Sequence, residues 1–215
     1  MRKRCFLRNI SIFDCIQFKM KKIFFLLSLI LLNSSLIAQN EIETLESVES
    51  SIFGIQAGFL GVWINNEAKL SNTIALKTEV GLDAALFGGS IYYEEDEVNY
   101  AFAPVITVEP RWYYNISKRA DKGRRTAKNT ANFVGLEVSY NPNLFVISNV
   151  DVDMFNQIRI IPKWAIRRTV FQHFTYEVGL GLGYRRAFFD ESDYLFSPDK
   201  GEIILDLHIR LGYTF

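Results

Sequence analysis

Beyond residue 50, apolar and polar side chains alternate along the chain with a period of two. Successive side chains of a β-strand point to opposite faces, so this pattern predicts strands with one apolar and one polar face. The clearest case is 202–215, where every second residue from Ile203 to Phe215 is apolar. Five further segments show the same split, and 52–64, which is apolar on both faces, adds a seventh. The predicted strands are 52–64, 73–84, 105–114, 133–141, 157–167, 172–184 and 202–215.

The length of these segments indicates what kind of sheet they form. They have 9–14 residues, whereas strands of globular proteins usually have about 5–6 and strands that cross a bilayer need about 9–11. After residue 50 the sequence has no apolar run long enough for a membrane helix. Only helices and closed barrels pair every backbone group inside a bilayer. The sequence therefore predicts an all-β fold, an antiparallel up-and-down transmembrane β-barrel.

The front of the chain has the features of an export signal. Lys21 and Lys22 precede a ten-residue apolar stretch, and Ala38 is a small residue suited to cleavage. We therefore interpret 20–38 as a cleaved signal peptide, because a membrane anchor, the alternative, needs about 20 apolar residues. Residues 1–19 are interpreted as an over-extended N-terminus. We expect 39–51 to be a short periplasmic segment and 52–215 to be the barrel.

Charge and cysteine content exclude several functions. The 215 residues include 24 basic and 24 acidic side chains, but residues 1–38 hold seven of the bases and one acid, which leaves a net charge of −6 beyond them. Binding to nucleic acid needs clustered positive charge and is not expected. Cys5 and Cys15 both lie in the front segment, so the rest has neither a disulfide nor a cysteine zinc site. No cofactor or metal is expected.

Aromatic residues predict how the strands are oriented. Trp63, Trp112, Trp164 and Phe215 lie near the C-terminal ends of their predicted strands. Because aromatic side chains gather at membrane interfaces, we expect these four strands to end at one periplasmic girdle. The other three strands then run outward. The short connections 65–71 and 168–171 and the basic stretch Lys118–Lys128 become periplasmic, and the longer loops near 87–100, 142–156 and 187–201 lie outside.

Seven strands are too few, because bacterial barrels have an even number. The sequence leaves two alternatives for the eighth strand: residues 40–51, whose apolar positions have helix-like spacing, or a short strand at 144–148. Pro110 and Pro162 each remove a backbone donor from a strand interior, which counts against the barrel unless they mark bulges.

The polar faces of the predicted strands carry acids and bases in near balance. An eight-stranded barrel has an interior that side chains can fill, and unpaired buried ions cost several kcal/mol, so we expect salt bridges that close the lumen. A narrow channel for ions or small solutes is the alternative, while a wide porin would need about 16 strands. The predicted lumen charge network comprises Lys77, Glu79, Asp83, Glu109, Arg111, Glu137, Arg159, Lys163, Arg167, Glu177, Arg185, Asp206 and Arg210.

Catalysis is not expected. His173, Thr175 and Glu177 share one strand face and are the residue types that a lipid-modifying enzyme uses. However, neighbours two residues apart are about 6.6 Å apart along a strand, and a base must reach its partner by a hydrogen bond. We interpret His173 and His208 as interior residues with satisfied hydrogen bonds. The acidic segments 92–97 and 190–199 are interpreted as solvated loops rather than divalent-cation sites, because they lack an EF-hand-like spacing.

Three segments resemble a known family. Residues 207–215 resemble the C-terminal strand of bacterial outer-membrane barrels, which ends on an aromatic residue, and residues 109–115 and 178–184 resemble strands of small, eight-stranded OmpA-like proteins. The resemblance implies eight strands, the outer membrane of a Gram-negative bacterium and a monomer with a structural or interaction role. It also implies that Tyr213 and Phe215 form an assembly signal for the barrel-assembly machinery, and that outer-membrane lipid and lipopolysaccharide surround the barrel.

Overall fold

The computed structural model describes residues 47–87, 99–152, 154–189 and 200–215. The predicted signal peptide (20–38) and the two predicted acidic loop segments (92–97 and 190–199) lie outside the described residues.

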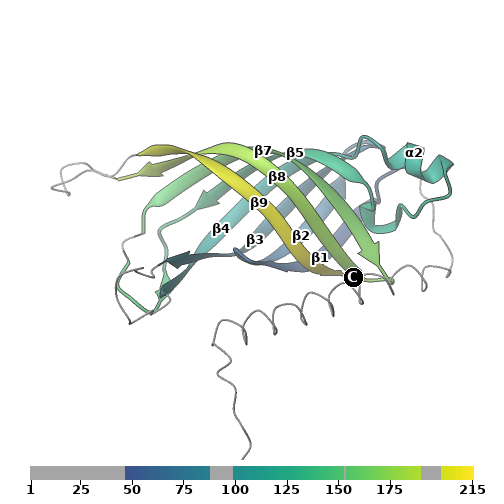
Figure 1. The fold of residues 1–215 in the computed structure, drawn as a ribbon. Coiled ribbons are helices and arrows are strands. Elements are labelled where there is room, and N and C mark those ends of the chain that lie inside the picture. Colours follow the sequence, from purple (N-terminus) through teal and green to yellow (C-terminus); the bar gives the residue numbers. More distant parts are fainter. Residues whose placement is uncertain (1–46, 88–98, 153, 190–199) are drawn as a thin grey trace, which may run out of the picture. The chain divides into compact units, whose positions relative to one another are not determined.

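Eight long antiparallel strands form a closed barrel (Figure 1). Consecutive long strands pair with each other, β9 pairs with β1, and the pairing of β3 with β4 extends over the full length of both strands. The prediction of an all-β, antiparallel up-and-down barrel of eight strands is therefore confirmed. The strands are β1 (Ser51–Gly58), β2 (Gly61–Lys69), β3 (Ile74–Phe87), β4 (Asn99–Trp112), β5 (Asn132–Asn141), β7 (Asn156–Val170), β8 (Phe174–Phe188) and β9 (Gly201–Thr214).

The predicted single strand 52–64 is wrong, because this segment is a hairpin of β1 and β2. The chain reverses at Phe59 and Leu60, and Gly58 pairs with Gly61 across the turn. Gly61 has a φ of +146°, and a Cβ there would lie 2.2 Å from the carbonyl oxygen of Leu82, so the turn requires glycine. The predicted turn 65–71 is also wrong at its start, because β2 continues to Lys69.

This hairpin supplies the eighth strand, so both predicted positions for it are wrong. Within 40–51, the described residues 47–50 are not in a strand, and β1 begins only at Ser51. Within 144–148, β6 (Ile147–Ser148) has two residues, which pair with Ala101 and Phe102 of β4 outside the ring of long strands.

The strands define two ends of the barrel. At the loop end, β3, β5 and β8 finish; at the cap end, β2, β4, β7 and β9 finish. The directions predicted for the six strands other than 52–64, relative to one another, are therefore confirmed. In the described parts of the chain no helix is long and apolar enough to cross a membrane.

Pro110 and Pro162 do not mark bulges, contrary to the sequence-based interpretation. Val108 pairs with Val138 and Arg111 with Gly135, so the register of β4 against β5 is the same on both sides of Pro110. The register of β7 against β8 is likewise unchanged across Pro162. Each proline interrupts one ladder without adding a residue, which is the effect of a missing N–H donor.

Two short helices and the start of the described chain cover the cap end. The connection between β4 and β5 holds α2 (Ile116–Asp121) and the 3₁₀ helix η1 (Ala127–Asn129). Glu49 accepts a hydrogen bond from the Lys128 backbone N–H at 2.5 Å, and its own N–H donates to Asn129. A small apolar core lies beneath: Val48, Ala75, Tyr113, Ile116, Ala131, Phe133 and Ala165.

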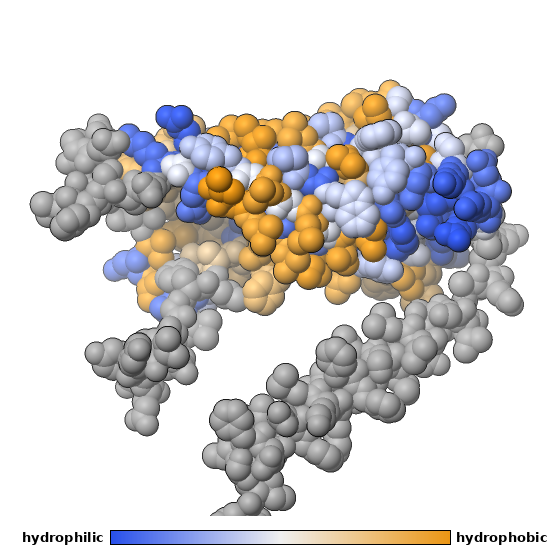
Figure 2. Space-filling model, turned by 45° about the horizontal axis from the view of Figure 1, so that its top comes forward, coloured by the Kyte–Doolittle hydropathy of each residue, from blue (hydrophilic) through white to orange (hydrophobic). Residues whose placement is uncertain are grey.

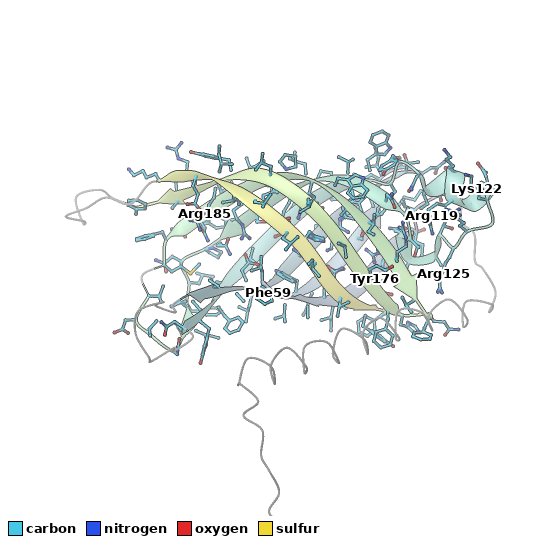
Figure 3. All side chains as sticks on the ribbon, in the orientation of Figure 1. Phe59, Arg119, Lys122, Arg125, Tyr176 and Arg185 are labelled. Atoms are coloured by element: carbon cyan, nitrogen blue, oxygen red, sulfur yellow. The ribbon has the colours of Figure 1, made fainter. Side chains whose placement is uncertain are left out.

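The basic stretch Lys118–Lys128 lies on this cap. Figure 3 shows Arg119, Lys122 and Arg125 gathered around α2 at one end of the barrel. Partial burial, followed by the nearby charges of Arg168 and Arg124, lowers the pKa of Arg119. The cap is therefore a positively charged surface whose guanidinium groups repel one another.

Side-chain polarity is reversed relative to a water-soluble barrel. Along β2 to β5 and β7 the inward positions are buried and largely polar, and the outward positions hold exposed apolar side chains. Figure 2 shows the apolar surface over the middle of the barrel and the hydrophilic surface gathered at the cap end. The polar residues of the chain are thus concentrated in the lumen and at the barrel's ends.

We predict that Gly81→Val destabilises the barrel. Gly81 pairs with Trp63, and a Cβ at residue 81 would lie 2.6 Å from Trp63 Cδ1 and 2.2 Å from the carbonyl oxygen of Val62. Overpacking of this kind typically costs about 1–3 kcal/mol, and the loss is measured as a lower urea midpoint of the folded protein in detergent. Thr78→Val, on the exposed outer face of the same strand, should leave the midpoint unchanged. Equal midpoints for the two variants would contradict the placement of Trp63 against Gly81.

Candidate functional site

A neutral cluster of charges, here called the charged plug, fills the cap-side part of the lumen. Four carboxylates and four cations take part, and seven of the eight residues are at most 2% exposed. At an effective dielectric well below that of water, such charges remain ionised only when they are paired. The charged plug consists of Glu67, Lys77, Glu79, Glu109, Arg111, Arg167, Glu177 and Arg210.

Glu177, on β8, lies at the centre of the charged plug. Its Oε1 accepts hydrogen bonds from Arg111 at 2.9 Å, from Arg167 at 3.2 Å and from Gln56 at 3.1 Å. Lys77 Nζ lies 4.0 Å from its other oxygen. One carboxylate therefore faces cations from three strands, β3, β4 and β7, and also accepts a hydrogen bond from an amide of β1.

The guanidinium groups of Arg111 and Arg167 each contact further side chains besides Glu177. Arg111 also contacts Glu109 at 2.8 Å and Glu67 at 3.5 Å, and its guanidinium carbon lies 4.2 Å above the ring of Phe133. Arg167 reaches Glu67 at 2.9 Å. Bidentate and stacked contacts of this kind suit the planar guanidinium, which lysine cannot imitate.

Arg210 joins the charged plug from β9. Its guanidinium donates to both carboxylate oxygens of Glu79 at 2.8 Å, while Lys77 contacts the same carboxylate at 2.5 Å. The guanidinium also lies 3.9 Å above the ring of Trp63, in a cation–π contact. The Trp63 ring and the Glu79 carboxylate therefore fix the position of Arg210.

His208 connects the charged plug to a second group of charges nearer the loop end. A carboxylate only accepts, so His208 donates from Nε2 to Glu177 at 2.9 Å, and Nδ1 is then the acceptor that faces Lys163 Nζ at 3.4 Å. Lys163 in turn contacts Glu137 at 2.5 Å and Asp206 at 2.9 Å. The interpretation of His208 as an interior residue with satisfied hydrogen bonds is confirmed.

The remaining ion pairs lie closer to the loop end. Arg159 pairs with Asp83, which also accepts a hydrogen bond from Trp63 Nε1 at 3.0 Å. Arg185 pairs with Glu202 at 2.5 Å, and both side chains are more than two-fifths exposed. Burial of the charges therefore decreases from the charged plug toward the loop end.

All thirteen residues of the predicted lumen charge network take part in at least one of these ion pairs. Sequence reasoning missed Glu67, because 65–71 was interpreted as a turn. It also missed Gln56, because 52–64 was interpreted as one strand without a polar face. The signal for both was the pair of glycines Gly58 and Gly61, which flank the true turn.

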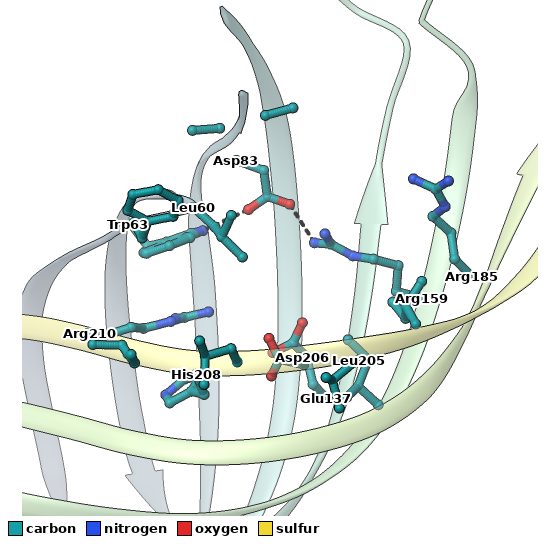
Figure 4. A pocket seen from close by; sticks show the side chains of 17 residues that line it. Leu60, Trp63, Asp83, Glu137, Arg159, Arg185, Leu205, Asp206, His208 and Arg210 are labelled. Atoms are coloured by element: carbon teal, nitrogen blue, oxygen red, sulfur yellow. Dashed lines mark hydrogen bonds and ion pairs between the residues drawn. The ribbon is translucent and has the colours of Figure 1, made fainter. Parts of the chain in front are cut away.

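A cavity of about 380 Å³ opens on the loop side of the charged plug. Figure 4 shows Trp63, Asp83 and Arg159 on one side of it and Asp206, His208 and Arg210 on the other. The cavity is lined by both acidic and basic groups.

His173, Thr175 and Glu177, which the sequence analysis rejected as a catalytic trio, are not brought together by the structure. His173 lies before β8, its Nδ1 is 2.7 Å from the carbonyl oxygen of Thr214, and its ring stacks on Tyr213. The imidazole that contacts Glu177 is that of His208. Across the described ranges no group of three His, Cys, Asp or Glu residues is arranged to hold a metal ion.

Three of the four predicted girdle residues share the cap end. Trp112, Trp164 and Phe215 are 53%, 47% and 59% exposed on the outer surface, and Trp164 donates a hydrogen bond to Tyr114. The prediction for the fourth residue, Trp63, is wrong, because this side chain is 5% exposed and faces the lumen. Because of the hairpin at Phe59 and Leu60, Trp63 lies near the start of β2. It is therefore on the loop side of that strand and not at the cap end.

Comparison of the chain with protein-family models, with curated proteins and with solved structures finds no match.

We predict that Glu177→Gln destabilises the folded barrel by about 3–5 kcal/mol, the typical cost of leaving buried charges without a partner. The substitution keeps the shape of the side chain and removes the negative charge between Arg111 and Arg167. Guanidinium unfolding of the full chain, followed by tryptophan fluorescence, measures the loss.

Glu202→Gln is the matched control, because it breaks the half-exposed pair with Arg185 and should cost at most about 1 kcal/mol. If both substitutions cost the same, the charged plug is not what stabilises the barrel.

Proposed function

We propose that this protein is a transmembrane β-barrel of a bacterial outer membrane, closed inside, with a structural or interaction role rather than a catalytic one. The observation that carries the proposal is the reversed polarity of the barrel. Arg111, Glu109 and Glu177 are fully buried, while large apolar side chains such as Leu182 and Val80 are more than three-fifths exposed. Apolar side chains around the outside are stable in lipid and costly in water.

The dimensions of the strands support the same proposal. β3, β4, β7, β8 and β9 have 14 or 15 residues. At about 3.4 Å per residue and a tilt of about 40°, such strands extend about 35 Å along the barrel axis. That length exceeds the apolar band of about 25 Å in outer-membrane barrels.

The arrangement at the cap end supports a periplasmic assignment for it. Exposed Trp112, Trp164 and Phe215 form an aromatic girdle beside the basic cap. The chain ends there in Tyr213 and Phe215, which the OmpA-like resemblance interprets as the signal for the barrel-assembly machinery. Lipid and lipopolysaccharide are then the surroundings of the outer face, and a monomer suffices because the sheet has closed on itself.

The charged plug favours a closed lumen over the alternative, a narrow channel. Its members come from six strands, and the central carboxylate of Glu177 has no exposed surface. An ion that crossed the barrel would have to break several buried pairs, each held in a low-dielectric interior.

We predict that the folded protein migrates faster in an SDS gel before boiling than after it, and that alkaline washing does not extract it from membranes. Both results follow from a closed barrel in lipid, since detergent does not unfold it until heat separates the β1–β9 and β3–β4 pairings. Recovery of the chain from residue 39 onward as a compact folded species in detergent-free buffer would contradict the proposal.

We also predict that the purified protein gives no discrete conductance steps in planar bilayers, whereas the double variant Arg111→Ala with Glu177→Ala does. The two substitutions remove one acid and one base from the centre of the charged plug, so its net charge is unchanged. Gel migration selects folded protein for both measurements. Reproducible steps from the unaltered protein would favour the channel over the closed barrel.

A further inference from the structure

The barrel wall is incomplete on the loop side between β9 and β3. β9 pairs with β8 from Phe174↔Tyr213 to Arg186↔Gly201, but its pairing with β1 covers only five residues and ends at Gly58↔Arg210. The part of β9 from Gly201 to Ile209 therefore has a paired strand on one side only among the described residues.

The opposite border of this gap is β3. Its pairing with β4 continues to Phe87↔Asn99, whereas its pairing with β2 ends at Gly61↔Asp83, with one further hydrogen bond from Ala84 N–H to the Leu60 carbonyl. The gap arises because the β1–β2 hairpin is short. Figure 3 shows Phe59, at the hairpin tip, partway along the barrel and short of the end where Arg185 lies.

The loop-side cavity passes through this gap. Residues of both faces of β9 line it: Leu205, Leu207 and Ile209 from the outer face and Asp206, His208 and Arg210 from the lumen face. In an intact wall, an interior cavity contacts only the lumen face of a strand, because alternate side chains point outward. The cavity is therefore a lateral opening from the lumen to the outer surface, and Leu60 at the hairpin tip lines it beside Trp63 (Figure 4).

The opening is amphipathic. Its outer rim is apolar, with Phe59 77% and Leu205 75% exposed. Its inner wall carries Arg159 and Arg185 as well as the carboxylates of Asp83 and Asp206. Phe215 N–H donates to the Phe53 carbonyl of β1, whereas Thr214 N–H donates to the His173 carbonyl beside β8, so the backbone groups of odd-numbered residues point toward β1. Leu207 and Leu205 continue that side of the strand and face the gap. Within a bilayer such groups need a polar partner.

We propose that this lateral opening binds a glycerophospholipid of the surrounding membrane, with its head group inside the cavity and its acyl chains against the apolar rim. This inference rests on the proposed membrane location. The phosphate shares Arg159 and Arg185, the guanidinium groups nearest the loop end, with their carboxylate partners Asp83 and Glu202. Ester and head-group atoms meet the backbone groups of β9 that face the gap. A cavity of about 380 Å³ is near the lower end of the usual range for small-molecule sites, about 300–1,000 Å³, which suits a head group but not whole acyl chains.

The three tryptophans provide the test. Trp63 lines the opening, whereas Trp112 and Trp164 lie on the outer surface at the cap end. The full chain is prepared in two forms, each with two tryptophans replaced by phenylalanine, so that only Trp63 or only Trp164 remains. Both are reconstituted in phosphatidylcholine bilayers with and without bromine atoms on the upper part of one acyl chain, which quench a tryptophan that they contact.

We expect brominated lipid to quench both forms at least twofold. If brominated lipid quenches Trp164 but not Trp63, the inference is overturned and the proposed membrane barrel is unaffected. If brominated lipid quenches neither tryptophan, the proposed membrane location itself is overturned. The two failures are therefore distinguishable.

Leu207 and Leu180 supply a matched pair of variants for the rim. They are Cα partners on β9 and β8 with exposed fractions of 56% and 57%, but only Leu207 lines the opening. Leu207→Lys, made in the form that keeps Trp63, should reduce quenching at least twofold, because a charge at the rim repels an acyl chain. Leu180→Lys should leave it unchanged. Equal quenching in the two variants would show that lipid does not enter through the gap.

A second pair of variants tests whether Arg185 binds the lipid phosphate. Arg185→Gln should at least halve the phosphorus that remains bound to the purified protein after detergent exchange, and Arg186→Gln, which alters the exposed neighbour on the opposite face of β8, should not. The same phosphorus content in both variants would overturn the role given to Arg185.

Discussion

Glu177 lies between the guanidinium groups of Arg111 and Arg167 in a part of the lumen where none of the three is more than 1% exposed. In an ordinary domain this position would belong to an apolar core, and the strands would be held by side chains that avoid water. Here the strands that meet at Glu177 are held by charge instead. Because apolar side chains occupy the outer face and charged side chains fill this part of the lumen, the register of each strand must bring acids next to bases.

The sequence predicted the features that depend on a period of two. Inward charges could be assigned because side chains alternate strictly along a strand, and the pairing partners follow once the strands are in a ring. The β1–β2 hairpin was missed because Phe59 and Leu60 are apolar and the usual turn residues Asn, Asp and Pro are absent. One missed turn then displaced Trp63, Glu67 and the eighth strand together, since each depends on where β2 begins.

The short hairpin and the charged plug divide the lumen into two parts. On the cap side, buried charges pair with one another, and the apolar core around Tyr113 and Phe133 lies at the end. On the loop side, the ion pairs become more exposed toward the end of the barrel and a cavity is present. Trp63 lies at the boundary, where it contacts Arg210 of the plug and Asp83 of the cavity wall. No pattern within a single segment shows such a boundary, because it depends on residues from β2, β3 and β9 at once.

The seam between β1 and β9 joins the two strands that are farthest apart along the barrel sequence, and its pairing is the shortest in the ring, from Gly54↔Thr214 to Gly58↔Arg210. Bringing such distant segments together carries the largest entropic cost of any pairing in the sheet, and few backbone hydrogen bonds compensate it. We therefore expect the ring to close last at this seam. Two further hydrogen bonds then stabilise the closed ring at its cap end. Phe215 N–H donates to the Phe53 carbonyl, and Lys128 Nζ donates to the Phe215 carbonyl.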